Sequence, residues 1–213
     1  MGVQTGRGEA EAAFLVVDVQ NDFCPGGALA VAGGDEVVAP VNALMAAFPA
    51  VVLTQDWHPA DHLSFASSHP GVEPFGIVTM PYGAQVAWPE HCVRGTRGAD
   101  FHPLLATECA DTIVRKGFRR EIDSYSTFFE NDRTTPTGLA GWLRERGFGA
   151  VVLAGLATDY CVRYSAIDAV RLGFTVTVVE DACRAIDLAG SLAEARAEME
   201  ALGVVFARVS DFV

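Results

Sequence analysis

The 213-residue chain lacks long apolar runs, closely spaced pairs of cysteines and, with one exception, lysine. No apolar run is long enough to cross a membrane as a helix, which needs about 20 residues. The first eleven residues are polar and glycine-rich and contain no apolar segment typical of a secretory signal. We therefore expect a cytoplasmic protein without a membrane anchor. The five cysteines include no C-x-x-C pair and do not predict a disulfide framework.

The chain is also poor in positive charge. Its formal net charge is −12, which argues against nucleic acid or an anionic membrane surface as a partner. This excess of negative charge favours a neutral or cationic small substrate over an anionic one. Lys116 is the single lysine among 15 basic residues, the others being arginine. Lys116 is either a chance occurrence in an arginine-rich chain or a residue whose function requires an amine.

Short apolar segments rich in β-branched residues alternate along the chain with segments of helical periodicity. The predicted strands lie at 13–19, 50–54, 111–116, 150–154, 174–179 and 204–207, and the predicted helices at 33–47, 136–147, 162–170 and 188–202. This alternation predicts an α/β fold in three layers (αβα), with a mostly parallel sheet of about six strands between helices. We expect residues 1–10 to form a flexible tail and residues 11–213 a single domain.

The stretch between the second and third predicted strands has little periodicity, up to about residue 110. It contains all five histidines and many prolines and glycines. A long irregular segment in a compact domain is usually functional or disordered, and the Trp, Phe and His content argues against disorder. We therefore expect this segment to contribute to a functional site.

Reactive side chains recur where the predicted strands end. Asp18 ends the first strand, Asp56 follows the second, Lys116 ends the third, and Cys161 follows the fourth. Functional sites of parallel sheets lie beyond the carboxyl ends of the strands, so we expect these groups to be neighbours. Each alone could be an ordinary polar strand end, but four at one edge favour a reactive site.

The turn before Cys161 favours a nucleophilic thiol. Gly155 permits a tight exit from the strand, and Thr158 or Asp159 can cap the following helix. Cys161 then falls in the first helical turn, where free N–H groups and the helix dipole lower the pKa of a thiol. The alternative is a small thiol that fills a gap in the core.

Asp18 and Lys116 could supply what such a nucleophile needs. Asp18 can accept the thiol proton, and Lys116 can provide a nearby cation that keeps Asp18 ionised. The N–H groups of Ala157 and Cys161 are candidates for an oxyanion hole. The alternative for Asp18 and Lys116 is a structural ion pair without a reaction.

Asp56 and His58 form a D-x-H pair whose side chains face the same way in an extended chain. His62 follows four residues later, and His91 lies further along the same irregular segment. Two histidines and a carboxylate with open positions suit Zn²⁺, Fe²⁺ or Mn²⁺. Isolated histidines are often surface or capping residues, but a carboxylate at a strand end favours a metal site.

Six motifs resemble those of bacterial nicotinamidases/pyrazinamidases, which are members of the isochorismatase-like cysteine hydrolase superfamily. The motifs occur in order between about residues 14 and 205. D-W-H-P and W-P-x-H-C-V are more specific than the superfamily motifs at the two ends. The six are DVQNDF (18–23), QDWHP (55–59), WPEHCV (88–93), KG (116–117), DSYS (123–126) and GLATDYCV (155–162).

The resemblance implies an isochorismatase-like hydrolase fold with a catalytic triad and a metal site at the matching positions. The triad would consist of Asp18, Lys116 and Cys161, and the metal ligands would be Asp56, His58 and His91. His62 matches a histidine that is a ligand in some members of the family and not in others.

The resemblance also implies a substrate pocket. Phe23 and Trp88 would line an aromatic slot for a pyridine ring, with Tyr125 close by. A cis peptide bond between Leu156 and Ala157 would turn the Ala157 N–H into the oxyanion hole, together with the N–H of Cys161.

The implied reaction is hydrolysis of nicotinamide to nicotinate and ammonia through a thioester on Cys161, as part of NAD salvage, with pyrazinamide as a second substrate. It would need one divalent metal ion and no organic cofactor. Zinc is the favoured ion, with iron and manganese as alternatives. The small-molecule substrate is the expected partner, and the oligomeric state stays open between a monomer and a homo-oligomer.

Three other functions compete with this one. The first is another amide or carbamoyl hydrolase of the same superfamily, although those enzymes generally lack the combined D-x-H and W-P-x-H-C metal motifs. The second is a non-catalytic metal-binding module, against which the complete Asp18, Lys116 and Cys161 set argues. The third is a metallohydrolase in which metal-bound water attacks directly and Cys161 is structural.

Overall fold

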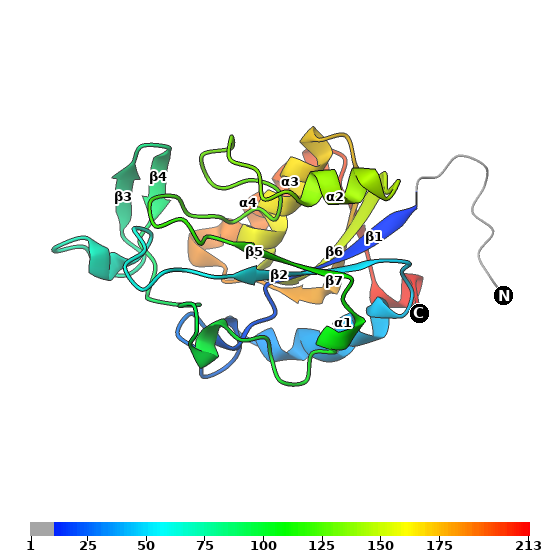
Figure 1. The fold of residues 1–213 in the computed structure, drawn as a ribbon, viewed down its shortest axis with the longest axis horizontal. Coiled ribbons are helices and arrows are strands. Elements are labelled where there is room, and N and C mark those ends of the chain that lie inside the picture. The colour runs from blue at the N-terminus through cyan, green and yellow to red at the C-terminus, as the bar shows by residue number, and fades with distance from the viewer. Residues whose placement is uncertain (1–10) are drawn as a thin grey trace.

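The computed structural model describes residues 11–213. The predicted tail, residues 1–10, lies outside the described residues. One sheet of six parallel strands forms the centre of the molecule (Figure 1). Its strands are β1 (Ala12–Val17), β2 (Val51–Asp56), β5 (Thr112–Lys116), β6 (Ala150–Leu156), β7 (Thr175–Arg184) and β8 (Val205–Ala207). No helix in this part of the chain is long and apolar enough to span a membrane.

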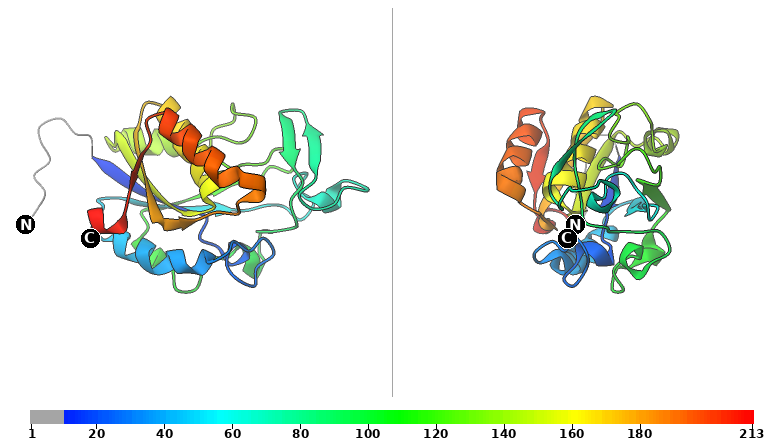
Figure 2. Two further views of the ribbon diagram at one scale, coloured as in Figure 1. Left: turned by 180° about the vertical axis from the view of Figure 1, so that it is seen from behind. Right: turned by 90° about the vertical axis from the view of Figure 1, so that its left-hand side faces the viewer.

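Helices cover both faces of the sheet, which confirms the predicted αβα layers. α1 (Val38–Met45) lies on one face, and the other face carries α2 (Leu139–Glu145), α3 (Arg163–Arg171) and α4 (Ser191–Ala201) (Figure 1 and Figure 2). Strands covered on both sides are apolar along their length rather than alternating. β1 and β2 are accordingly buried almost throughout.

The strand order, β5-β2-β1-β6-β7-β8, places a switch point between β1 and β6. From β1 the chain proceeds outward through β2 to β5, and from β6 it proceeds in the opposite direction through β7 to β8. Such a reversal leaves a crevice at the carboxyl ends of the two central strands, where ligands bind in doubly wound folds. Asp18 follows β1 and Cys161 lies beyond β6, so both residues border this crevice.

The segment predicted to be irregular contains a β-hairpin. β3 (Ile77–Met80) and β4 (Gly83–Val86) pair antiparallel and lie at the end of the molecule opposite to the C-terminus (Figure 1). Each strand has only four residues, which is too short a run for its alternation of buried and exposed positions to stand out in the sequence. A small apolar cluster around Val78 and Met80 supports the hairpin, apart from the main core.

Some predicted elements differ in extent. β7 continues five residues beyond the predicted end, to Arg184, because after an irregularity it pairs again with the last residues of β6. The helix predicted at 33–47 begins as a 3₁₀ turn, Gly34–Val37, before α1. The extension of β7 arises from pairing between distant segments, which local periodicity does not report.

Gly155 brings β6 into close contact with β1. Its φ is +123°, and a Cβ added there would lie 2.2 Å from the carbonyl oxygen of Val17. Val17 is also the register partner of Gly155 across the two strands. A larger residue at 155 therefore requires β1 to move.

We expect Gly155→Ala to lower the free energy of unfolding by about 3 kcal/mol, because it combines a positive φ with overlap in a packed core. Gly173→Ala is the matched control: Gly173 also has a positive φ (+89°), but no atom lies within 4 Å of its added Cβ. The control should cost about 1 kcal/mol. Urea denaturation measures both values, and equal losses would show that the contact with Val17 is unimportant.

Candidate active site

Asp18 is the first residue beyond β1, with a positive φ of 48°. Thr54 of β2 orients it, since Thr54 Oγ1 donates to Asp18 Oδ1 at 2.6 Å and accepts from the Asp18 N–H at 3.1 Å. The side chain is fully buried. Burial raises the pKa of Asp18 above its usual range, although Lys116 opposes this effect. A carboxylate of raised pKa is a better proton acceptor than an exposed one.

Lys116 joins the parts of the site. Its Nζ lies 2.7 Å from Asp18 Oδ2 and 2.5 Å from Asp56 Oδ1, and it donates to the carbonyl oxygen of Ser124 at 2.8 Å. The side chain has 0% exposure. Burial alone would lower the pKa of Lys116, but the two carboxylates outweigh it and raise the pKa well above the usual value. The amine is therefore a permanent buried cation.

Cys161 is buried at the same place. Its Sγ lies 3.5 Å from Lys116 Nζ and within 4.8 Å of a carboxylate oxygen of Asp18 and one of Asp56. Burial raises the pKa of Cys161 well above its usual value, with Lys116 acting in the opposite direction. The prediction of a lowered thiol pKa at a helix start is wrong, because burial raises the pKa of this thiol more than Lys116 lowers it. The resting group is a thiol, so a reaction requires a proton acceptor such as Asp18.

The turn that carries Cys161 differs from the predicted helix start. The peptide bond between Leu156 and Ala157 is cis, as predicted. The chain then forms a π-helical turn, Thr158–Val162, so Cys161 precedes α3 rather than opening it. No side chain caps this turn, and the predicted cap by Thr158 or Asp159 is wrong. The Asp159 carboxylate instead accepts hydrogen bonds from the segment that follows β7.

Asp56, His58 and His91 present three ligand atoms to one point. Asp56 Oδ2 lies 3.6 Å from His58 Nε2 and 3.9 Å from His91 Nε2, and all three side chains are buried. Each imidazole uses Nδ1 to donate to a backbone carbonyl at 2.8 Å, that of Gly117 for His58 and that of Pro89 for His91. These contacts fix the two rings and leave each Nε2 with a free lone pair.

This set fits a divalent metal ion. His58 Nε2 is buried and has no hydrogen-bond partner within residues 11–213. Burial lowers the pKa of His91 to about 4, so its imidazole is neutral. Burial also lowers the pKa of His58, but the Asp56 carboxylate outweighs it, so a proton and a metal ion would compete for this nitrogen. Two imidazole nitrogens and a carboxylate oxygen are ligands that Zn²⁺ accepts.

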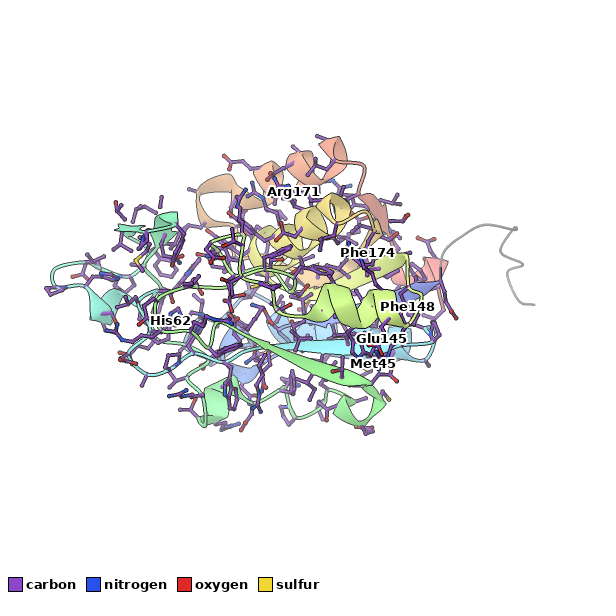
Figure 3. The ribbon with its side chains drawn as sticks, turned by 45° about the horizontal axis from the view of Figure 1, so that its top comes forward. Met45, His62, Glu145, Phe148, Arg171 and Phe174 are labelled. Carbon is purple, nitrogen blue, oxygen red and sulfur yellow. The ribbon has the colours of Figure 1, made fainter. Side chains whose placement is uncertain are left out.

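His62 lies beside this set and is engaged elsewhere. Its ring is 4.5 Å from that of His58, but Nδ1 contacts Ser64, whose N–H donates to it at 3.1 Å, and Nε2 faces the Ile122 carbonyl at 3.3 Å. His58, His62 and Asp123 form a second group of close ligand atoms. Figure 3 shows His62 and Phe148, which precedes β6, on opposite sides of the centre of the molecule, as expected for a site beyond the carboxyl ends of the strands.

A narrow pocket joins the thiol to the metal-ligand set, and aromatic side chains enclose it. Its walls include all three predicted slot residues, Phe23, Trp88 and Tyr125. Trp88 Nε1 donates to the hydroxyl of Tyr125 at 2.9 Å, and Gln85 of β4 donates to the same oxygen at 2.8 Å. The hairpin absent from the sequence prediction therefore helps to orient the pocket wall.

Four further residues line this pocket, and their positions in it were not predicted. Asp123 lies in the DSYS motif and Tyr160 in the GLATDYCV motif, so the sequence already indicated that their segments contribute to the site. Leu29 and Ile186 lie in connecting segments without a motif, and only the folded chain brings them to the pocket.

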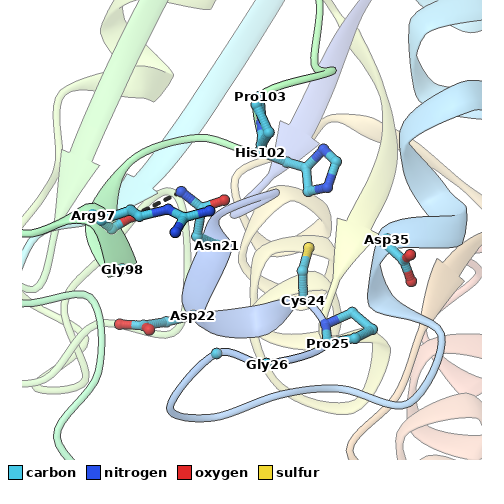
Figure 4. A pocket seen from close by; sticks show the side chains of 11 residues that line it. Asn21, Asp22, Cys24, Pro25, Gly26, Asp35, Arg97, Gly98, His102 and Pro103 are labelled. Atoms are coloured by element: carbon cyan, nitrogen blue, oxygen red, sulfur yellow. Dashed lines mark hydrogen bonds between the residues drawn. The ribbon is translucent and has the colours of Figure 1, made fainter.

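A larger hollow, of about 430 Å³, lies beside the loop that follows β1, residues 21–27 (Figure 4). Asn21, Asp22 and Arg97 are among the residues that line it. The Asp22 carboxylate is occupied, since it accepts hydrogen bonds from the N–H groups of Ala28 and Cys92. Its role here is structural, because it ties the segment of Phe23 to that of His91.

A family model described as the isochorismatase domain matches residues 12–211. A nicotinamidase from Acinetobacter baylyi is 55% identical over 192 residues, which cover 90% of each chain. A solved structure of a nicotinamidase/pyrazinamidase from Acinetobacter baumannii is 52% identical, has a TM-score of 0.94, and aligns over 96% of this chain and 99% of that one.

A crystal structure of the pyrazinamidase of Pyrococcus horikoshii in complex with zinc is also similar. It is 36% identical, has a TM-score of 0.76, and aligns over 93% of this chain and 99% of that one. The matches span nearly the whole chain and include relatives far above 30% identity. The chain therefore belongs to the isochorismatase domain family and, within it, to the nicotinamidases.

Proposed function

We propose that this protein hydrolyses nicotinamide to nicotinate and ammonia through a thioester on Cys161, and that it also accepts pyrazinamide. One observation carries the proposal. A single narrow pocket is lined by Cys161, by Asp56 and His91, and by flat aromatic side chains. Lys116 lies behind the Cys161 thiol, and His58 completes the ligand set with Asp56 and His91. The names of the A. baylyi and A. baumannii relatives support the same activity.

The pocket suits a flat heteroaromatic amide. Phe23 and Trp88 offer apolar surfaces to the ring, and the Tyr125 hydroxyl fixes the Trp88 indole. Asp56, His58 and His91 would hold the metal ion, which we propose to be zinc, with iron and manganese as alternatives. When bound, the ion would supply a Lewis acid that orients the ring nitrogen.

Asp18 and Cys161 perform the first half of the reaction. As the thiol sulfur forms a bond to the carboxamide carbon, its proton passes to Asp18, whose raised pKa favours acceptance. The N–H groups of Ala157 and Cys161 stabilise the oxyanion, a contribution of about 3 kcal/mol for each donor. Collapse of the tetrahedral intermediate breaks the C–N bond, and Asp18 returns the proton to the leaving ammonia.

In the second half of the reaction, water is the nucleophile and the Cys161 sulfur is the leaving group. A water molecule attacks the thioester carbon while Asp18 takes its proton. Breaking the C–S bond releases the acid, and Asp18 returns the proton to the sulfur of Cys161. Throughout both halves, Lys116 remains a cation that stabilises whichever of Asp18 and Cys161 is negatively charged.

Cys161→Ala should reduce ammonia release from nicotinamide by about 10⁴-fold or more, because Cys161 is the one cysteine among residues 11–213 that lines the pocket. The variant should bind as much metal as the wild type. Cys109→Ala is the control, since Cys109 is an exposed free thiol outside the pocket. The test is a coupled ammonia assay with a metal analysis of the same samples. Turnover retained by Cys161→Ala would exclude the covalent route and favour direct attack by metal-bound water.

Lys116→Arg should lower kcat/KM by about 100-fold although it keeps the charge. The ammonium contacts Asp18, Asp56 and the Ser124 carbonyl within a fully buried space, which a planar guanidinium does not fit. Arg115→Lys at the neighbouring exposed position is the matched reverse exchange and should keep wild-type kinetics. Steady-state kinetics with nicotinamide decide this, and full activity of Lys116→Arg would reduce the role of Lys116 to bulk charge.

His58→Ala should lower the metal content after dialysis from near one ion per chain to below about 0.2, because it removes one of three protein ligands. His102→Ala should keep the metal, since the His102 ring contacts the Leu104 N–H outside the ligand set. Atomic absorption gives the content, and chelation followed by separate addition of zinc, iron and manganese identifies the active ion. Unchanged metal in His58→Ala would remove this residue from the ligand set.

A further inference from the structure

Asp159 is a buried carboxylate that the proposed chemistry does not use. It lies two residues before Cys161 and is 1% exposed. Its Oδ1 accepts from the N–H of Ile186 at 3.0 Å, and its Oδ2 accepts from the N–H of Asp187 at 2.7 Å and from the hydroxyl of Ser191 at 2.5 Å. The nucleophile turn therefore holds the segment between β7 and α4 through one side chain.

That segment needs an external restraint. Asp187 and Ala189 have positive φ values, 54° and 52°, and Gly190 follows at 89°. Each non-glycine residue in this region costs about 1 kcal/mol relative to an extended or helical backbone. A further contact near this segment is the ion pair of Arg184 with Glu36, which is partly exposed and therefore weak. Asp159 supplies the buried hydrogen bonds that hold this conformation.

Ile186 is where this restraint reaches the substrate. Its N–H donates to the Asp159 carboxylate, and Ile186 is one of the residues that line the pocket. The pocket has only about 20 Å³ of free space, so a small displacement of one wall changes which ring fits.

We propose that Asp159 is a positioning residue for substrate selection: it fixes Ile186 as a pocket wall and so favours an unsubstituted pyridine carboxamide over one with ring substituents. This rests on the proposed function, because it concerns the substrate of the same pocket. Asp159 acts through Ile186 and touches neither the substrate nor the reacting atoms.

Asp159→Asn is the direct test. The amide has one acceptor oxygen and places an NH₂ group against an N–H or hydroxyl donor, so the segment should loosen. We expect KM for nicotinamide to rise about 10-fold with kcat within about 2-fold of wild type. The kcat/KM of ring-methylated nicotinamides relative to nicotinamide should rise about 5-fold, because a methyl group in a pocket changes discrimination by this order.

The chain offers a matched control. The Asp132 carboxylate also accepts from two N–H groups and one hydroxyl, those of Thr134 and Thr135, but Asp132 does not line the pocket. Asp132→Asn should leave KM and the selectivity ratio unchanged. Ile186→Ala should raise the same ratio as Asp159→Asn, and the double variant should gain little beyond Ile186→Ala, since both changes act on one wall.

The outcomes separate the two proposals. If the wild type does not hydrolyse nicotinamide, the proposed function fails. If the wild type is active and Asp159→Asn changes yield and kcat without moving the selectivity ratio, Asp159 is only structural and the present proposal is overturned. If Asp159→Asn does not fold, Ser191→Ala, which removes one of the three donors, decides instead: a smaller rise in the same ratio supports the proposal, and an unchanged ratio overturns it.

Discussion

The site depends on a buried ammonium between two buried carboxylates. Lys116 lies between Asp18 and Asp56, and all three side chains are almost completely excluded from solvent. Two carboxylates at this separation would repel one another and could not both stay ionised without a cation between them. Removing a charge from water costs several kcal/mol, so each member of the group is tolerated only because the others are present. The same ammonium thereby couples the residues around the thiol to the residues that suit a metal ion.

Sheet topology explains why this cation is a lysine. β5, which carries Lys116, is at the edge of the sheet, and β2 separates it from β1 and Asp18. Asp56 is the direct register partner of Lys116, so it lies within easy reach, whereas Asp18 lies one strand further. A long unbranched side chain with a compact head can lie along β2 and still contact both carboxylates. The geometry of the sheet thus explains why the single lysine of this arginine-rich chain is at position 116.

Much of this arrangement could be predicted from the sequence, since apolar strands that end in Asp18, Asp56 and Lys116 indicate a parallel sheet with reactive groups at one edge. The rest depends on distances that no local pattern encodes. The thiol pKa follows burial, which the chain acquires only when folded, and not the position of Cys161 near a helix. Ile186 enters the pocket because β7 is longer than its apolar run predicts.

The turn from Gly155 to Cys161 also serves two sides of the pocket at once. In a helical turn, side chains two positions apart point in nearly opposite directions. Cys161 faces the pocket between β1 and β6, and Asp159 faces the segment after β7. Because one rigid turn presents both groups, the nucleophile and the Ile186 wall cannot shift independently. The spacing of two residues between Asp159 and Cys161 therefore links the position of the reacting sulfur to the shape of the pocket that receives the ring.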